Sequence, residues 1–304
     1  MYERPYTELA TVAGKLGMRY QQSRDLKVGT LSSRWTSLKF TQNSRVMLLN
    51  NFRIYLGFAV AGSKGKLYLC SQDMRNIIRP LLTPQVFSHK PRLKKIVIDP
   101  GHGGRDPGCS NESLGMLEKE LVLAWAMQLK ETLQERGYQV LLTRHSDRYV
   151  ENTNRFKYAN DVNADLFLSL HFNSVPRSSV HGIETYVYTP LGQPSSSRSQ
   201  IEEIDLKARP ANHYDPWSTL AGFNIQRQLI QSIGGIDRGL KRARFSMLSG
   251  LNCPGVLIEG GFFSNRTEAK KIKSAWHRKK LAEAVAVGVD AYHNTLKKIS
   301  GKDA

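Results

Sequence analysis

The sequence predicts an α/β fold, a mostly parallel twisted sheet flanked by helices, preceded by a small α+β domain. Short apolar runs rich in β-branched residues alternate with longer segments that carry apolar residues at helical spacing, an order typical of parallel strands covered by helices. A polar, proline-containing linker over residues 83–94 separates this region from the one before it. We therefore expect two domains, at 1–90 and 94–300.

Residues 1–90 have the pattern of a small α+β unit without a catalytic cluster. The spacing of apolar residues predicts a helix over 7–16, and a second helix begins near Ser71 and should end before Pro80. Strands are expected at 35–40, 45–49, 52–58 and 66–70. This unit holds 14 Lys or Arg against 4 Asp or Glu, so it supplies +10 of the chain's net charge of +18. Such a surface attracts anionic polymers, and we expect it to bind one or to act as a spacer.

The region from residue 94 onward alternates strands and helices. Strands are expected at 96–98, 139–143, 166–170, 182–189 and 256–258, and helices at 118–136, 154–162, 216–233, 265–276 and 277–296. Gly137 should end the first of these helices. A polar stretch at about 190–215 interrupts the alternation, and we interpret it as an insertion.

Three apolar strands each end at a residue suited to metal binding or acid–base chemistry. Ile96–Ile98 leads through Asp99-Pro100-Gly101 to His102, the next such strand ends at His171, and a third ends at Glu259. Open α/β sheets place their sites at the carboxyl ends of strands. The convergence indicates a catalytic metal site.

A hydrolytic zinc takes three protein ligands and keeps one position open. His102 and His171 supply two imidazoles, and Glu118, at the start of a long helix, is the expected carboxylate ligand. Glu120 is its main rival, and Asp106 and Glu112 are weaker candidates. A separate carboxylate must move the proton of the attacking water, and Glu259 is suited to that role.

These segments resemble the zinc-dependent N-acetylmuramoyl-L-alanine amidases of the amidase-3 type. The resemblance covers roughly residues 94–297 and rests on four motifs: Ile98 to Gly104, Glu118-Lys119, Ser169 to Asn173 and Ile258 to Asn265. It implies one Zn²⁺ per chain held by His102, Glu118 and His171, with Glu259 catalytic. It also implies hydrolysis of the amide between N-acetylmuramic acid and L-alanine in peptidoglycan. Residues 1–90 are weakly similar to the small domain at the N-termini of copper amine oxidases, which implies no copper chemistry here.

Two other classes of function stay open on the residues alone. A metallocarboxypeptidase also uses His, Glu and His, but the 16-residue gap between His102 and Glu118 disfavours it. A non-catalytic module for an anionic polymer would use the net charge, but intact candidate ligands argue against it. We expect no nucleic-acid partner, and an activator protein stays unknown.

Two further expectations concern location and regulation. The first five residues lack the apolar run of a signal peptide, whereas the implied substrate places the protein in the periplasm or the extracellular envelope. Either the protein is exported by another route or the chain shown has been trimmed. The acidic residues Glu202, Glu203 and Asp205 in the insertion suggest a lid that offers a carboxylate to the zinc. The competing interpretation, slightly favoured, is a surface loop that shapes the substrate groove.

Overall fold

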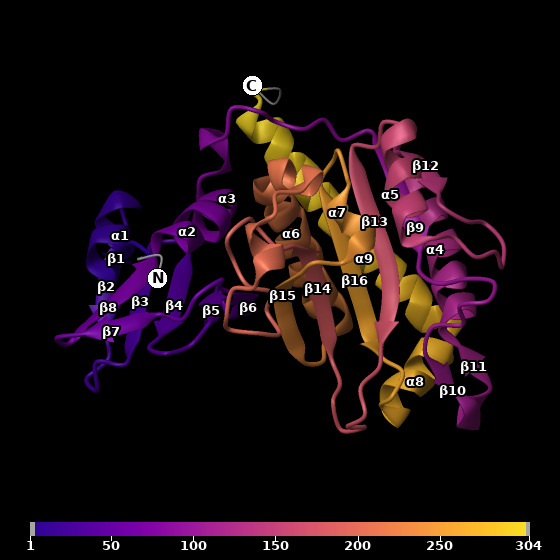
Figure 1. Ribbon diagram of the computed structural model, residues 1–304, viewed down its shortest axis with the longest axis horizontal. Coiled ribbons are helices and arrows are strands. Elements are labelled where there is room, and N and C mark those ends of the chain that lie inside the picture. Colours follow the sequence, from indigo (N-terminus) through magenta and orange to yellow (C-terminus); the bar gives the residue numbers. More distant parts are fainter. Residues whose placement is uncertain (1–3, 302–304) are drawn as a thin grey trace.

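The computed structural model is built around one sheet of eleven strands in the order β12-β9-β13-β16-β14-β15-β6-β5-β4-β3-β2 (Figure 1). The structure describes residues 4–301, so the first three residues of the polar amino-terminal stretch lie outside it. The strands of the carboxyl-terminal half are β9 (Lys95–Pro100), β12 (Gln139–Leu142), β13 (Leu166–Asn173), β14 (Ile183–Tyr188), β15 (Asp237–Ala243) and β16 (Gly255–Phe262).

This half of the sheet is mostly parallel, as predicted. Strands β12, β9, β13 and β16 run parallel, and β14 is antiparallel to β16 and parallel to β15. The apolar runs of β9, β13 and β16 are buried almost throughout because helices cover both faces. The carboxyl ends of β9, β13 and β16 therefore meet at one end of the sheet.

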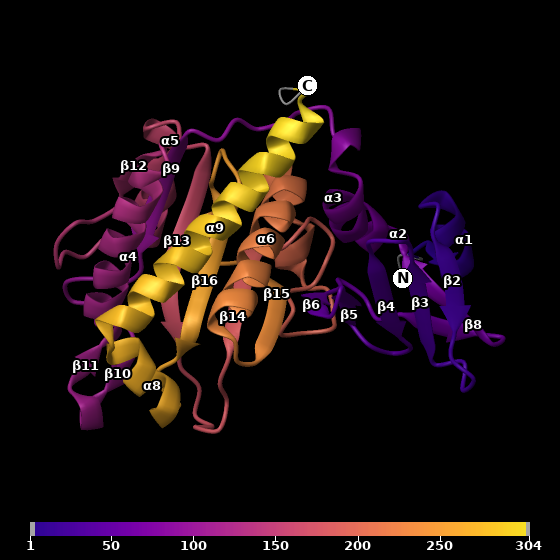
Figure 2. The same ribbon diagram turned by 180° about the vertical axis from the view of Figure 1, so that it is seen from behind.

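Helices form a layer on each face. One face carries α4 (Glu118–Glu135), α6 (Asp215–Ile233) and α9 (Ala275–Ile299) (Figure 2). The other carries α5 (Asn152–Asp161) and α7 (Ser246–Ser249), while α8 (Arg266–Lys273) lies beyond the end of β16 (Figure 1). Val122, Trp125, Leu129 and Leu133 are buried and form the apolar stripe of α4. Among residues 4–301, no helix is both long and apolar enough to cross a membrane.

The amino-terminal unit extends the sheet with an antiparallel meander. Its strands are β2 (Arg19–Gln22), β3 (Val28–Ser32), β4 (Ser37–Thr41), β5 (Val46–Leu49) and β6 (Phe52–Tyr55). A second small sheet contains β1 (Tyr6–Glu8), β8 (Lys66–Cys70) and β7 (Ala61–Ser63), and α1 (Leu9–Lys15) packs between the two. The connection onward comprises α2 (Ser71–Asp73), the π-helical turn Met74–Ile78, α3 (Arg79–Leu82) and the 3₁₀ turn Pro84–Val86.

The helix expected to end before Pro80 continues past it to Leu82. Pro80 lies in the first turn of α3, directly after the π-helical turn, where a missing backbone N–H costs little. The prediction of a stop at Pro80 was therefore wrong by one turn.

The two regions that the linker separates in sequence share the large sheet. Ile54 of β6 pairs in parallel with Leu240 of β15. The Arg242 guanidinium donates to the Tyr55 carbonyl at 2.7 Å, and the Arg53 N–H donates to Asp237 at 2.7 Å. The linker thus marks a change from antiparallel to parallel architecture, while the sheet itself is continuous.

The polar segment at 190–215 lies at the end of the sheet opposite His171. It follows β14, which runs antiparallel to β16, so it leaves the sheet beside the start of β16. Asp205, in the 3₁₀ turn Glu203–Leu206, is buried between Arg198, at 2.6 Å, and Arg244, at 2.6 Å. Arg45 of the amino-terminal unit also donates to the Pro194 and Ser195 carbonyls of this segment. The acidic cluster therefore does not face the candidate zinc site, which argues against a lid over the metal, while the interpretation as a groove-shaping loop stays a prediction.

Candidate metal centre

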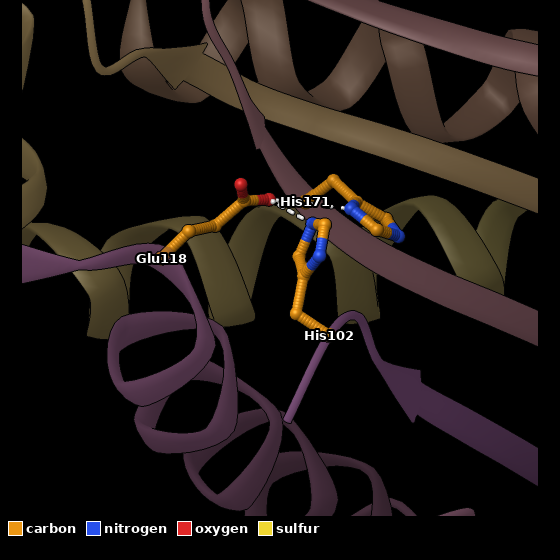
Figure 3. Close-up of side chains that lie close together, drawn as sticks. All are labelled: His102, Glu118 and His171. Atoms are coloured by element: carbon orange, nitrogen blue, oxygen red, sulfur yellow. Dashed lines mark hydrogen bonds and ion pairs between the residues drawn. The ribbon is translucent and has the colours of Figure 1, made fainter. Parts of the chain in front are cut away.

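Three side chains from distant parts of the sequence meet at the carboxyl ends of β9 and β13 (Figure 3). His102 lies in the loop after β9, His171 near the end of β13, and Glu118 at the first position of α4. Glu118 Oε1 lies 3.2 Å from His102 Nε2 and 3.2 Å from His171 Nδ1. The structure therefore brings together the three residues expected to be metal ligands.

The backbone around these side chains is shaped to hold them close. His102 has a left-handed backbone, with φ of 61°, which turns its side chain back over the strand end. A Cβ at Gly101 would lie 2.1 Å from the His171 ring, and one at Gly108 would lie 2.7 Å from both Glu118 and the His102 ring. Glycine is thus required at both positions because the imidazoles and the carboxylate occupy that space.

A buried ionic network fixes the His102 loop. Asp99, fully buried at the end of β9, accepts hydrogen bonds from Thr143 at 2.6 Å, Arg155 at 2.7 Å and Ser169 at 2.8 Å. Arg155 also donates to the His102 carbonyl at 3.0 Å. The network therefore holds the backbone on which the His102 imidazole stands.

Arg144 braces the same loop from the other side. Its guanidinium donates to the Gly101 carbonyl at 2.8 Å and to the Lys119 carbonyl at 2.7 Å, so it ties the His102 loop to the start of α4. Both arginines stand in segments that also fit the family resemblance, Leu142 to Arg144 and Arg155 to Asn160, but the sequence pattern indicates no backbone contact for either.

Glu118 is oriented by two backbone groups. The Phe172 N–H donates to Oε1 at 3.0 Å and the Cys109 N–H donates to Oε2 at 2.9 Å. Burial would raise the pKa of Glu118, but its interactions with His102 and His171 hold the pKa well below the ordinary value. Glu118 is therefore an ionised, fixed carboxylate at the point where both imidazoles meet.

The rival carboxylates lie elsewhere. Glu120 and Glu112 are exposed and outside the cluster. Asp106 contacts His102 on the opposite ring nitrogen, with Oδ2 2.9 Å from Nδ1. A residue in this position orients the imidazole and does not bind the same metal ion.

Glu259 lies beside the cluster on the same face of the sheet. It pairs with His171 of β13 on one side and with Glu184 of β14 on the other. Its Oε2 atom is buried and has no hydrogen-bond partner among the described residues. Burial, together with the nearby Glu118 and Glu184, raises the pKa of Glu259 well above its ordinary value.

Glu184 is the neighbour that sequence reasoning missed. It is buried and accepts hydrogen bonds from Asn173 at 2.6 Å, Tyr186 at 3.0 Å and Arg238 at 3.0 Å, and it forms an ion pair with Lys241. The available signal was a charged residue near the start of an otherwise apolar strand.

A family model described as N-acetylmuramoyl-L-alanine amidase matches residues 96–291. The chain belongs to this amidase family. The sporulation-specific N-acetylmuramoyl-L-alanine amidase of Bacillus subtilis (strain 168) is 35% identical over 210 residues, which cover 68% of this chain and 71% of that protein. The amidase is accordingly a hydrolase that cleaves the bond between N-acetylmuramic acid and L-alanine in peptidoglycan.

Solved structures agree with the fold. The N-acetylmuramoyl-L-alanine amidase from Clostridium difficile 630 aligns with a TM-score of 0.57 at 28% identity, covering 67% of this chain and 98% of that one. The CwlD amidase from Clostridioides difficile, solved in complex with the GerS lipoprotein, aligns with a TM-score of 0.56 at 28% identity, covering 66% and 99%. The family match begins at residue 96, so the amino-terminal meander lies outside it.

Proposed function

We propose that His102, Glu118 and His171 bind one Zn²⁺ and that Glu259 is the general base of the amidase reaction. The observation that carries this proposal is the meeting of Glu118 Oε1 with one nitrogen of each imidazole at 3.2 Å. Two ligand atoms about 2.0–2.1 Å from a tetrahedral zinc lie about 3.3 Å apart, so the spacing suits this metal.

The chemistry of the donors supports the same assignment. Two imidazoles and one carboxylate form a ligand set typical of catalytic zinc. Asp106 occupies the second nitrogen of His102, which favours presentation of Nε2 to a metal. The buried, unpartnered Glu259 Oε2 lies on the neighbouring strand, where an attacking water would need an acceptor.

When bound, Zn²⁺ supplies Lewis acidity toward the scissile carbonyl and the attacking water. Glu259 takes the proton of that water and passes it to the departing amide nitrogen. Burial and the neighbouring carboxylates raise the pKa of Glu259, which makes it a stronger base toward the proton of the attacking water than an exposed carboxylate would be. Arg144 and Arg155 keep the His102 loop in place by donating to its backbone carbonyls, and Asp99 in turn holds Arg155.

The setting of the reaction is also a proposal. Relatives named as cell-wall amidases support action in the periplasm or the extracellular envelope. The +10 charge of residues 1–90 supports contact with an anionic wall polymer, and nothing in the site favours a nucleic-acid partner. A lipoprotein is bound to one solved neighbour, which supports a search for an activator protein.

Product analysis of digested sacculi tests the proposed function. We expect new L-alanine amino termini and lactyl carboxyl groups in equal amounts, and their loss when a chelator removes the metal. Release of single carboxyl-terminal amino acids would instead indicate a carboxypeptidase. Binding without any product would indicate a non-catalytic module.

A further inference from the structure

The meander β2–β6 leaves one face of the large sheet exposed. Its buried face carries Leu31, Leu38, Phe40, Met47 and Ile54, which pack in the core with α1. We define the strand platform as the residues opposite this core, which are Gln21, Thr30, Ser37, Lys39, Leu48 and Arg53. All six are exposed or half-buried, and strands β2–β6 contain no Asp or Glu.

The strand platform lies on the same face of the sheet as Glu259 and its cross-strand partner Glu184, which we call the catalytic row. Glu184, opposite Glu259, is bound by Lys241 of β15. The Lys241 ammonium lies 5.4 Å from the centre of the Tyr55 ring in β6 and 5.6 Å from that of Tyr186 in β14. Since Tyr55 and Arg53 lie two residues apart on one strand, Arg53 points to the side that holds Glu259.

From Arg53 the row continues without a gap. Cross-strand pairs join Arg53 to Leu48, Leu48 to Lys39, and Lys39 to Thr30. Lys39 is five strands from Glu259 in the sheet order. At about 4.8 Å per strand this places it roughly 24 Å from the catalytic carboxylate along the sheet.

An exposed aromatic residue lies at the end of the platform that is level with the carboxyl ends of β13 and β16. The turn between β3 and β4 lies at the end of the sheet where β13 and β16 finish, because the strand directions alternate through the meander. Trp35 in this turn is 76% exposed, and the Arg34 guanidinium lies 4.5 Å above its ring. A shallow hollow of about 480 Å³ on the platform is lined by residues that include Gln21, Thr30, Lys39 and Leu48.

We propose that the strand platform and Trp35 bind the part of the peptidoglycan strand that extends beyond the bond being cut. This inference rests on the proposed function, since it concerns the substrate of the same site. Amide and hydroxyl side chains can hydrogen-bond sugar hydroxyl and N-acetyl groups, and an exposed indole offers a flat apolar surface to a sugar ring. Lys39 and Arg53 complement the carboxylates of peptide stems. Continuity with the catalytic row favours the substrate polymer over a separate anionic polymer, which would need only diffuse charge.

Binding to sacculi stripped of anionic wall polymers tests this proposal. The measurement uses the full chain carrying Glu259→Gln, so that the sacculi stay intact, and reads the Kd by co-sedimentation. We expect Lys39→Glu and Trp35→Ala each to raise the Kd at least fivefold. Lys15→Glu, which makes the same charge change at the end of α1, and Trp276→Ala, at an indole 65% exposed on α9, are matched controls that should stay within twofold.

Each outcome decides the question. Equal losses in Lys39→Glu and Lys15→Glu would show diffuse charge attraction and overturn the platform. Losses seen only with unstripped walls would assign the surface to an anionic polymer instead, and unchanged binding in both platform variants would also overturn it. If the wild-type chain releases no L-alanine amino termini, the proposed function fails, and the binding measurement still tests the platform separately.

Discussion

Glu259 and Glu184 are cross-strand partners on β16 and β14, yet only Glu184 is paired with cations. Arg238 and Lys241 contact Glu184, whereas Glu259 Oε2 has no hydrogen-bond partner in the described part of the chain. Two neighbouring carboxylates therefore have opposite environments. The paired one is a structural anion, and the unpaired one beside His171 is available for proton transfer.

Replacing Glu259 by Gln should separate metal binding from catalysis. The amide keeps the shape of the side chain but cannot accept the proton of water, so kcat should fall by roughly 10²–10⁴-fold. Metal content by elemental analysis should stay at one Zn²⁺ per chain. Glu203→Gln, at an exposed carboxylate far from the site, is the control. Near-normal turnover in Glu259→Gln would assign the proton transfer to another residue.

Replacing His102 by Ala should remove both zinc and activity. The variant keeps Glu118 and His171 but loses one of three proposed ligands, and the buried Glu118 carboxylate loses one of its two imidazole neighbours. Zinc content after dialysis is the measurement that matters here. His145→Ala, at an exposed histidine, should retain full zinc. Full zinc content in the His102 variant would eliminate the assignment.

Glu118 and Glu120 provide a direct test of the carboxylate ligand. Glu118→Gln should lower zinc affinity by orders of magnitude, because an amide is a poor ligand and its N–H₂ group would face the Phe172 or Cys109 N–H. Glu120→Gln should leave affinity unchanged, since Glu120 is exposed. Competition with a chromogenic chelator measures both. The reverse ranking would show that α4 shifts when the metal binds.

Asp205 should matter for stability and not for inhibition. Asp205→Ala leaves Arg198 and the mostly buried Arg244 without their shared carboxylate, which should cost roughly 3–5 kcal/mol of the free energy of unfolding. Glu203→Ala removes only an exposed pair with Lys207 and should cost less than about 1 kcal/mol. Urea unfolding measures both. A rise in basal amidase activity in Asp205→Ala would restore the idea of a lid.

His277 should make the protein less stable in mild acid. Burial lowers the pKa of His277 to about 4, and Lys271, Lys280 and Arg278 act in the same direction. Between that value and about 6.5, the unfolded chain binds a proton that the folded chain does not, so stability falls as pH falls through this window. His277→Gln should therefore lose less stability than wild type between pH 7.5 and 5. If its unfolding midpoint tracks that of wild type or of His145→Gln, the histidine is not responsible.

The sequence predicted the parallel core and the cluster because both depend on local patterns. The apolar runs of β9, β13 and β16 each lead to a polar residue suited to metal binding or acid–base chemistry, and neighbouring parallel strands must bring such ends together. Gly101 leaves the space that the His171 ring fills, a contact between two strands that the sequence around Gly101 does not indicate. Glu118 was favoured over Glu120, and the structure places only Glu118 in the cluster.

Other features depend on contacts that no local pattern reveals. Strand β15 carries Asp237, Arg238, Lys241 and Arg242, so it has no apolar run, yet pairing on both sides and the buried hydrogen bonds of Arg242 hold it inside the sheet. Strands β2 and β3 were also missed, because they contain too few apolar residues to show the alternation of apolar and polar residues that is typical of a strand. The joining of the two regions through β6 and β15 has no signature in either segment alone.

The pairing of β6 with β15 has a consequence for how the chain avoids self-association. An unpaired β15 would present free backbone N–H and carbonyl groups along the flank of a large sheet, and such flanks recruit strands from other molecules. The meander pairs with that flank and extends the sheet as far as β2. This edge strand is short, consists of Arg, Tyr and two Gln, and offers little apolar surface to another molecule. Residues 4–70 therefore protect the flank of the catalytic half from pairing with other molecules, and a chain cut at the linker should precipitate or dimerise through β15.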